Sequence, residues 1–220
     1  MPRISLNKLG EYVEASLARR KAIVKDAKYP PVIKVARYSE VRTDITAYFT
    51  SGYDDNVLKA AIKKFEEKKP ESPWHEQNQR GSIDFLELLP VLELPDLHGF
   101  DVLAYKGDNP KMNIAGVDIS VNPDAIIKGH IKDKPVVGAI KYYTSKGVRI
   151  GEEGSKTIAT LLSKFVEENL LQGEEKVCHD FCLSVDFHGE QVYSAPKAFK
   201  RRLQNVETAC EEIRLRWDSL

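Results

Sequence analysis

The chain has few cysteines and no excess of charge of either sign. Its three cysteines cannot all pair, and this low number predicts a reduced, cytoplasmic protein rather than a disulfide-stabilised one. Thirty-three basic and thirty-three acidic residues cancel over 220 positions. This balance excludes a general basic coat for nucleic acid, but it is compatible with a local basic patch.

Long apolar runs and the common nucleotide-binding motifs are also missing. No apolar run approaches the roughly 20 residues of a membrane-spanning helix, and residues 1–25 are charged throughout, unlike a signal peptide. There is no GxGxxG motif, Walker loop or nucleophile elbow. We therefore expect no membrane contact. The 42% of hydrophobic residues is enough to exclude disorder as the main state.

Basic residues concentrate near the N-terminus. Residues 1–70 contain fifteen Lys or Arg and nine Asp or Glu, an excess of six positive charges. Apolar residues in this region recur at steps of three and four, as one face of a helix requires. The pattern predicts a helical N-terminal extension over residues 1–70, with Ser5 and Asp55 as helix caps, Tyr29-Pro30-Pro31 as a non-helical break, and a polar linker at 68–73.

The rest of the chain predicts a mixed sheet with flanking helices. Strands are expected where β-branched and aromatic residues gather between turn residues, and helices where apolar residues return to one face. The expected helices are 82–89, 155–166 and 199–217, and the expected strands are 112–121, 125–127, 135–143, 181–187 and 191–194, with a turn at 129–134. Residues 80–220 thus predict an α/β (α+β) domain.

The main candidate for chemistry is Pro123-Asp124 followed by Lys141. Asp124 lies at a kink between strand segments and Lys141 on the next strand, so two adjacent antiparallel strands would bring both side chains to one face. A carboxylate is a hard oxygen ligand for Mg²⁺. The metal would polarise a phosphoryl oxygen, and the lysine would neutralise charge that develops on the phosphate.

This spacing, with a helix before and a helix after, resembles the PD-(D/E)XK nuclease superfamily over about residues 80–200. The resemblance implies a restriction-endonuclease-like core, in which a helix, a mixed sheet led by an antiparallel meander, and a second helix follow one another. It also implies magnesium-dependent hydrolysis of DNA phosphodiesters, with Asp124 as a metal ligand and Lys141 as the assisting residue. The literal match is Pro123-Asp124 and Lys141, whereas Ala139 stands at the acidic position of the triplet.

Ala139 leaves several interpretations open. The protein is a degenerate member that lost cutting, or a metal ligand has moved to Asp118 or to Glu87 on the preceding helix (Asp84 is the neighbouring choice), or Ala replaces a natural acid in this chain. An alternative function is a non-catalytic scaffold or adaptor that binds DNA or protein. In the simplest interpretation, Asp124 caps a turn and Lys141 is a solvated strand residue.

Two basic clusters are candidate contacts for a nucleic-acid backbone. The last helix begins with basic residues, which its own dipole disfavours, and this favours a binding role. These candidate DNA-binding residues are Lys197, Lys200, Arg201 and Arg202. The second cluster comprises Arg19, Arg20, Lys21, Lys25 and Lys28. Both clusters are also compatible with a solvated helix face.

One segment contains two cysteines and a histidine, as metal-binding motifs do: Cys178-His179-Asp180-Phe181-Cys182. A zinc site commonly needs a second Cys/His pair, and the sequence does not provide one. Buried strand cysteines are the competing interpretation. The apolar stripe of residues 199–217 fits either a core or a dimer seam. By analogy alone, small nuclease-like proteins resemble components of DNA repair, restriction or antiviral defence.

Overall fold

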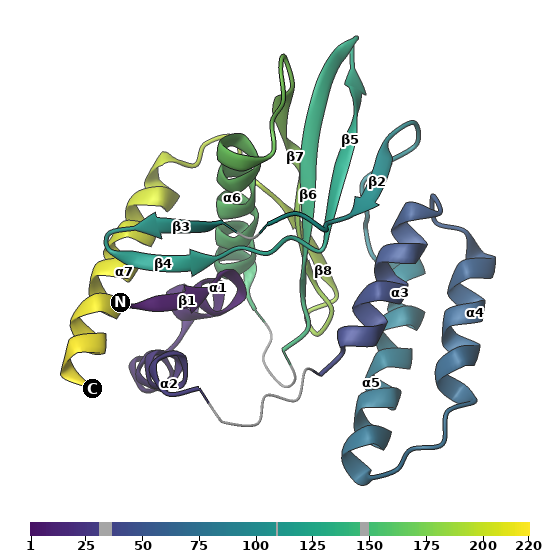
Figure 1. The fold of residues 1–220 in the computed structure, drawn as a ribbon, viewed down its shortest axis with the longest axis horizontal. Helices are drawn as coiled ribbons and strands as arrows, with labels where there is room; N and C mark the ends of the chain where they lie inside the picture. The colour runs from purple at the N-terminus through teal and green to yellow at the C-terminus, as the bar shows by residue number, and fades with distance from the viewer. Residues whose placement is uncertain (31–36, 109, 146–149) are drawn as a thin grey trace.

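A computed structural model describes residues 1–30, 37–108, 110–145 and 150–220 (Figure 1). The helices are α1 (Leu6–Glu14), α2 (Leu17–Lys28), α3 (Ser39–Thr50), α4 (Asp55–Glu66), α5 (Pro73–Leu88), the 3₁₀ turn η1 (Leu89–Val91), α6 (Glu152–Asn169) and α7 (Lys200–Ser219). The strands are β1 (Arg3–Ser5), β2 (Asp101–Ala104), β3 (Lys111–Ile114), β4 (Val117–Ser120), β5 (Ala125–Ile131), β6 (Lys134–Tyr143), β7 (Lys176–Asp186) and β8 (Gln191–Ser194). These elements confirm a mixed α/β protein.

The central sheet has the strand order β2-β5-β6-β7-β8. Strands β2, β5 and β6 form an antiparallel meander, after which α6 crosses over so that β7 runs parallel to β6. Strand β8 returns antiparallel to β7, as the expected hairpin. The turn between β5 and β6 is shorter than the expected 129–134, because Lys132 and Asp133 both adopt a left-handed conformation that closes a two-residue hairpin.

A second, three-stranded sheet has the order β1-β4-β3. The single strand expected over 112–121 is wrong, because the chain reverses at Ala115-Gly116, where φ is 48° and 81°. Strands β3 and β4 therefore form a hairpin. Strand β1, which the sequence did not suggest, pairs in parallel with β4.

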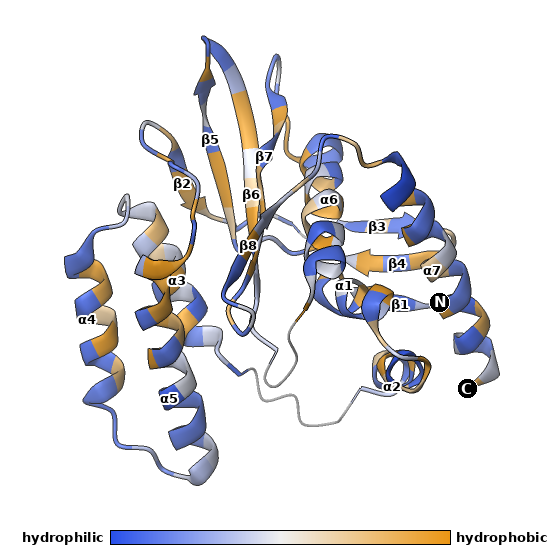
Figure 2. Cartoon of the chain, turned by 180° about the vertical axis from the view of Figure 1, so that it is seen from behind, coloured by the Kyte–Doolittle hydropathy of each residue, from blue (hydrophilic) through white to orange (hydrophobic). Residues whose placement is uncertain are grey.

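Alternation along β6 separates two hydrophobic cores. Neighbouring side chains of a strand point to opposite faces, so Ala139 and Tyr143 join a core with α1, α6 and α7, while Ile140 and Tyr142 join a core with α3, α4 and α5. Figure 1 shows α3, α4 and α5 together on one side of the central sheet and the second sheet on the other. The faces of the helices that turn toward these cores are the hydrophobic ones in Figure 2.

The two cores cut across the expected division near residues 70–80. Strand β1 and helices α1 and α2 pack with the second sheet, whereas α3 and α4 pack with α5 on the other face of the central sheet. Residues 1–70 therefore contribute to both hydrophobic cores. Ser72 caps α5, which begins at Pro73, so residues 68–72 of the expected linker lie outside a helix.

Helix ends follow local chemistry with some corrections. Ser5 caps α1 as expected, α1 ends at Glu14, and Ser16 caps α2. Asp54, rather than Asp55, caps α4. The break at Tyr29-Pro30 is confirmed, while Pro31 lies outside the described residues.

Helix α6 begins at Glu152, three residues before the expected start at residue 155. Ser155 lies fully buried inside the helix, and Gly151 precedes the first turn. The carboxylate of Glu14 accepts a hydrogen bond from the backbone N–H of Gly151 at 2.7 Å, and acidic groups suit this helix end. Helix α7 confirms the helix expected over 199–217. Cys210 and Ile213, which belong to its apolar stripe, lie in the core. Among the helices described, none combines the length and the apolarity that crossing a bilayer requires.

A bulge in β7 brings backbone close to the middle of β6. Val137 pairs with Val177 but Ala139 pairs with Cys182, so β7 carries extra residues between these two pairs. Phe181 in the bulge approaches Gly138 so closely that a Cβ at position 138 would lie 2.5 Å from the Phe181 carbonyl oxygen. Only glycine fits there, directly beside Ala139.

Alkaline pH is expected to destabilise the fold through buried thiols. Burial raises the pKa of Cys182 and of Cys210 from 9.0 to about 12. The folded state keeps these protons while the unfolded state loses them, so their stabilising contribution is complete below about pH 9 and is lost as the pH rises toward 12. Urea unfolding at a series of pH values from 8 to 11 measures this loss.

The matched control is the Cys182→Ala/Cys210→Ala variant. We expect it to be less stable at pH 8, because two buried side chains are shortened, but to lose less free energy of unfolding per pH unit above pH 9 than the native chain. Equal slopes in the two proteins would contradict the assignment. Buried Tyr12 and partly buried Tyr53, whose pKa values desolvation raises from 10.0 to about 12, contribute to both profiles alike.

Candidate functional site

Asp124 and Lys141 meet where β5 begins beside β6. The backbone N–H of Asp124 donates to the carbonyl of Ile140 at 2.9 Å, which fixes the start of the strand pair. The Nζ atom of Lys141 then lies 3.3 Å from Oδ2 of Asp124. The structure thus brings together the two residues on which the expected site depends.

Lys141 is held by the loop that precedes Asp124. Its Nζ donates to the backbone carbonyl of Asn122, a residue with a left-handed φ of 44°. Asn tolerates this conformation better than most residues. The Lys141 side chain is only 8% exposed. Burial lowers the pKa of Lys141, Asp124 opposes this shift, and Arg42 adds to it.

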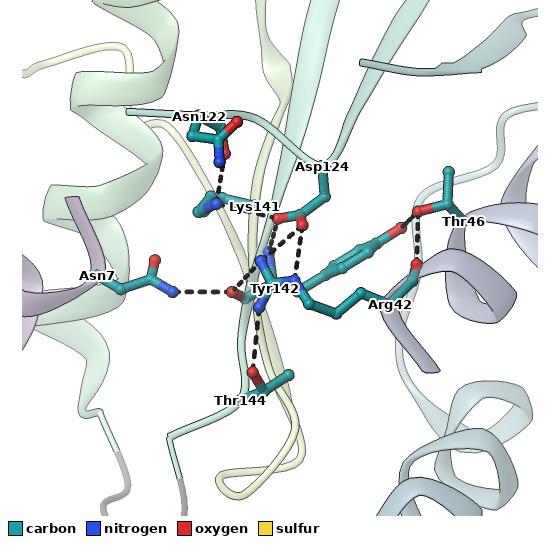
Figure 3. Close-up of polar contacts among 8 residues, drawn as sticks. All are labelled: Asn7, Arg42, Thr46, Asn122, Asp124, Lys141, Tyr142 and Thr144. Carbon is teal, nitrogen blue, oxygen red and sulfur yellow. Dashed lines mark hydrogen bonds and ion pairs between the residues drawn. The ribbon is translucent and has the colours of Figure 1, made fainter. Parts of the chain in front are cut away.

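Arg42 on α3 is a member of the site that sequence reasoning missed. Its Nε and Nη2 donate to Oδ1 of Asp124 at 3.0 and 2.6 Å, and its Nη1 donates to Oγ1 of Thr144 at 3.1 Å (Figure 3). The backbone N–H of Tyr142 donates to Oδ2 of Asp124 at 2.8 Å. Both carboxylate oxygens of Asp124 are therefore engaged by cationic and backbone donors.

Tyr142 joins the cluster to both sides of the sheet. Its fully buried hydroxyl lies 3.2 Å from Oγ1 of Thr46 on α3, and burial raises its pKa far above the ordinary value. Its backbone carbonyl accepts from Nδ2 of Asn7 on α1 at 2.9 Å. Figure 3 shows Asn7 and Thr46 approaching β6 from opposite sides. The site is thus a junction of α1, α3, β5 and β6. We call Arg42, Asp124 and Lys141 the Asp124 cluster.

The Asp124 cluster does not fit a divalent cation in this sequence. It combines one carboxylate with two cations, a formal charge of +1, and Asp124 already accepts from both cations. Ala139, on the Lys141 side of β6, supplies a buried methyl group. No group of three or more Asp, Glu, His or Cys residues able to hold a metal occurs in the described ranges. The donor set suits an anion better.

The other expected metal ligands lie elsewhere. Glu87 is exposed on α5, whose residues Phe85 and Leu86 pack on the opposite face of the central sheet from Ala139. Asp118 on β4 accepts from Nδ2 of Asn113 at 2.9 Å and lies 3.6 Å from Nζ of Lys111. The structure does not bring Glu87 or Asp118 into contact with Asp124.

Helix α1 lies on the Ala139 side of β6 and carries a buried acid. Glu11 is 5% exposed and lies 2.5 Å from both Lys8 and Arg19, with the hydroxyl of Tyr143 at 3.5 Å. Sequence reasoning looked for this acid on the helix just before the strands. Only the packing of α1 against α6 and the sheet shows that Glu11 faces this side.

The four basic residues near the start of α7 have different surroundings. Lys200 and Arg201 are exposed, and Lys197 is 3.7 Å from Asp180 with 80% of its side chain exposed. Arg202 is only 14% exposed and pairs with both carboxylate oxygens of Glu153 on α6, at 2.8 and 3.2 Å. Arg202 therefore joins two helices, while the other three remain candidate DNA contacts.

The cysteine-histidine segment forms a different local arrangement. Cys178 and Cys182 are buried free thiols, and burial raises the pKa of each. Nδ1 of His179 lies 2.7 Å from Oγ of Ser163 on α6. Ser163 and His179 line a cavity of only about 50 Å³, which has room for water but not for a substrate.

No family model matches the chain, and no curated protein matches it significantly.

Removing Arg42 is expected to destabilise the protein. In the Arg42→Gln variant, Asp124 loses two charge-assisted hydrogen bonds in a place where its side chain is only 10% exposed. We expect the free energy of unfolding to fall by about 1.5–3 kcal/mol. Chemical denaturation measures the change.

Arg80→Gln is the matched control. The Arg80–Glu76 pair on α5 spans 3.5 Å with 76% of Arg80 exposed, so its loss is expected to cost less than about 1 kcal/mol. If Arg42→Gln and Arg80→Gln lowered the free energy of unfolding by the same small amount, the Asp124 cluster would not be the strong contact that the distances indicate.

Two exposed residues of α7 test the expected DNA contact. Lys200→Ala/Arg201→Ala should reduce the magnitude of the salt slope of duplex binding by up to about 1.8, because each lost phosphate contact removes about 0.9. Arg202→Ala should instead lower the melting temperature, because Arg202 pairs with Glu153. An unchanged slope in the double variant excludes this helix as a DNA contact.

Proposed function

We propose that the chain is a nuclease-like protein of the PD-(D/E)XK type that acts on DNA, with hydrolysis dependent on an acidic residue at position 139. The observation that carries the proposal is the 3.3 Å contact between Lys141 and Asp124 at the junction of β5 and β6. Ala139 leaves the chain without a second carboxylate beside this contact, so we propose that the present sequence binds DNA but cuts poorly.

The order of the elements supports the proposal. Helix α5, the meander β2-β5-β6, helix α6 and the parallel strand β7 follow one another as in the core that the superfamily resemblance implies. The hairpin β3-β4 is inserted between β2 and β5. Asp124 precedes the second strand of the meander, and Ala139 and Lys141 lie on the third.

The side chains of the Asp124 cluster suit a phosphodiester group. The buried Lys141 ammonium and the Arg42 guanidinium converge on one carboxylate and leave a formal excess of one positive charge. Held in a largely water-excluded place, such cations stabilise negative charge that develops on a phosphate. Asp124 orients both cations, and a magnesium ion enters the proposal only together with an acid at 139.

The test compares Ala139→Glu with Ala139→Gln. The two side chains have nearly the same shape, but only Glu adds a carboxylate two residues from Lys141 on β6. We expect Ala139→Glu to cleave plasmid and single-stranded DNA in the presence of magnesium, and Ala139→Gln and the present chain to cleave far less. Isothermal titration with magnesium alone gives an independent readout of the new ligand.

Lys141→Met in the Ala139→Glu background is expected to lose at least about 10²-fold in rate, on the scale of one lost transition-state contact. Melting temperatures of all variants separate loss of activity from loss of folding. A folded Ala139→Glu variant that neither binds magnesium nor cleaves DNA would contradict the nuclease proposal.

The engagement of Asp124 favours a second candidate, the non-catalytic scaffold. With four donors on its two oxygens, Asp124 is satisfied as a structural anchor between α3 and the central sheet. This function predicts DNA or protein binding that an acid at 139 leaves unchanged. DNA binding by a folded Ala139→Glu variant without any cleavage would favour it.

A further inference from the structure

A basic groove of about 840 Å³ lies between helices α1 and α2 and the strands β1 and β4. Figure 1 shows these four elements close together near the N-terminus, on the side of the central sheet away from α3, α4 and α5. Three basic side chains line the groove: Arg3, Lys8 and Arg19. The chain as a whole has no net charge, so this local concentration of cations indicates a site that attracts an anionic ligand.

The groove keeps a positive charge after its ion pairs are counted. Glu11 pairs with Lys8 and Arg19, and Asp26 is the acid in the lining, so three cations face two carboxylates. Lys8 and Arg19 each retain 39% exposure of their side chains despite their pairing. Arg3 is exposed and has no ion-pair partner within the described part of the chain.

Hydroxyl groups and one aromatic ring complete the lining. Ser5 and Ser120 are register partners of the parallel pair β1–β4, and both are exposed on the groove side. Tyr29, 56% exposed, stands at the end of α2, and Nζ of Lys28 lies 5.6 Å from its ring centroid. Cations with hydroxyls suit phosphates, and an exposed ring beside a cation suits a stacked base.

Two walls of the groove lead to the Asp124 cluster. On α1, Lys8 follows Asn7, which donates to the carbonyl of Tyr142. On the other wall, the chain runs from Ser120 to Asn122, whose carbonyl accepts from Lys141. Both walls therefore run from the groove to residues that contact Tyr142 or Lys141.

We propose that this groove binds a single strand of nucleic acid and leads it to the Asp124 cluster. Phosphates contact Arg3, Lys8 and Arg19, and an unpaired base stacks on Tyr29. A duplex offers no free base face to Tyr29, because its bases are paired and stacked inside, so the ring favours a single strand. The inference rests on the proposed function for its direction toward Lys141.

The test measures binding without cleavage. Fluorescence anisotropy of a labelled oligo(dT) strand, and of a duplex of equal length, is followed in EDTA over a series of potassium chloride concentrations. Arg3→Gln/Lys8→Gln removes two cations but keeps Arg19 to pair with Glu11. We expect the magnitude of the salt slope for oligo(dT) to fall by about 1.4, because each contact to a single strand contributes about 0.7.

The matched control is Lys59→Gln/Lys69→Gln, which removes the same charge from exposed positions on and after α4. This variant should leave the slope unchanged. Tyr29→Ala should weaken oligo(dT) binding about 5-fold or more with the slope unchanged, while Tyr29→Phe, which keeps the ring, should bind as the native chain does. Melting temperatures confirm that each variant is folded.

Three results would overturn the inference: no binding of oligo(dT), equal effects of the groove and control variants, or an equal effect of the groove variant on duplex and single strand. Failure of the proposed function is a separate outcome, because it is measured by magnesium-dependent cleavage in the Ala139→Glu variant. If the chain binds oligo(dT) in EDTA through the groove while the Ala139→Glu variant is inactive, the groove proposal is supported and the nuclease proposal is contradicted.

Discussion

The Asp124 cluster is the contact that connects helix α3 to the central sheet. Arg42 reaches it from α3 on one side of the central sheet, and Lys141 reaches it from β6. Since each partner would be left as a poorly solvated charge without the others, the cluster fixes how α3 lies against the sheet. Among the described residues, this cluster is the one site where a buried lysine, an arginine and a carboxylate lie in contact.

Alternation along β6 decides which groups can cooperate. Odd-numbered residues Ala139, Lys141 and Tyr143 share the side covered by α1 and α6, and this side determines that Glu11, rather than Glu87, is the nearby helical acid. The charge of the site follows from the same geometry. Because Ala139 carries no charge, the two cations of the Asp124 cluster face a single carboxylate.

The N-terminal residues acquire their role through position. Arg3, Lys8 and Arg19 lie in the first 20 residues, and they line a groove next to Asn7, which donates to the carbonyl of Tyr142 on β6. Pairing of β1 with β4 makes this possible, because β4 ends just before the Asn122 turn. The short segment from Ser120 to Asn122 therefore connects the proposed groove to the Asp124 cluster.

Local chemistry in the sequence by itself determined the class of fold, the start of α1 at Ser5, the presence of α7, the strand β6 and the opposition of Asp124 and Lys141, because periodicity, capping and strand pairing act over short distances. It did not reveal the turn at Ala115-Gly116, which depends on left-handed backbone conformations. Only the tertiary structure decided that Arg42 holds Asp124 and that Glu11 faces the Ala139 side. Those contacts join residues 82 and 132 positions apart, and packing of whole helices, rather than local pattern, selects them.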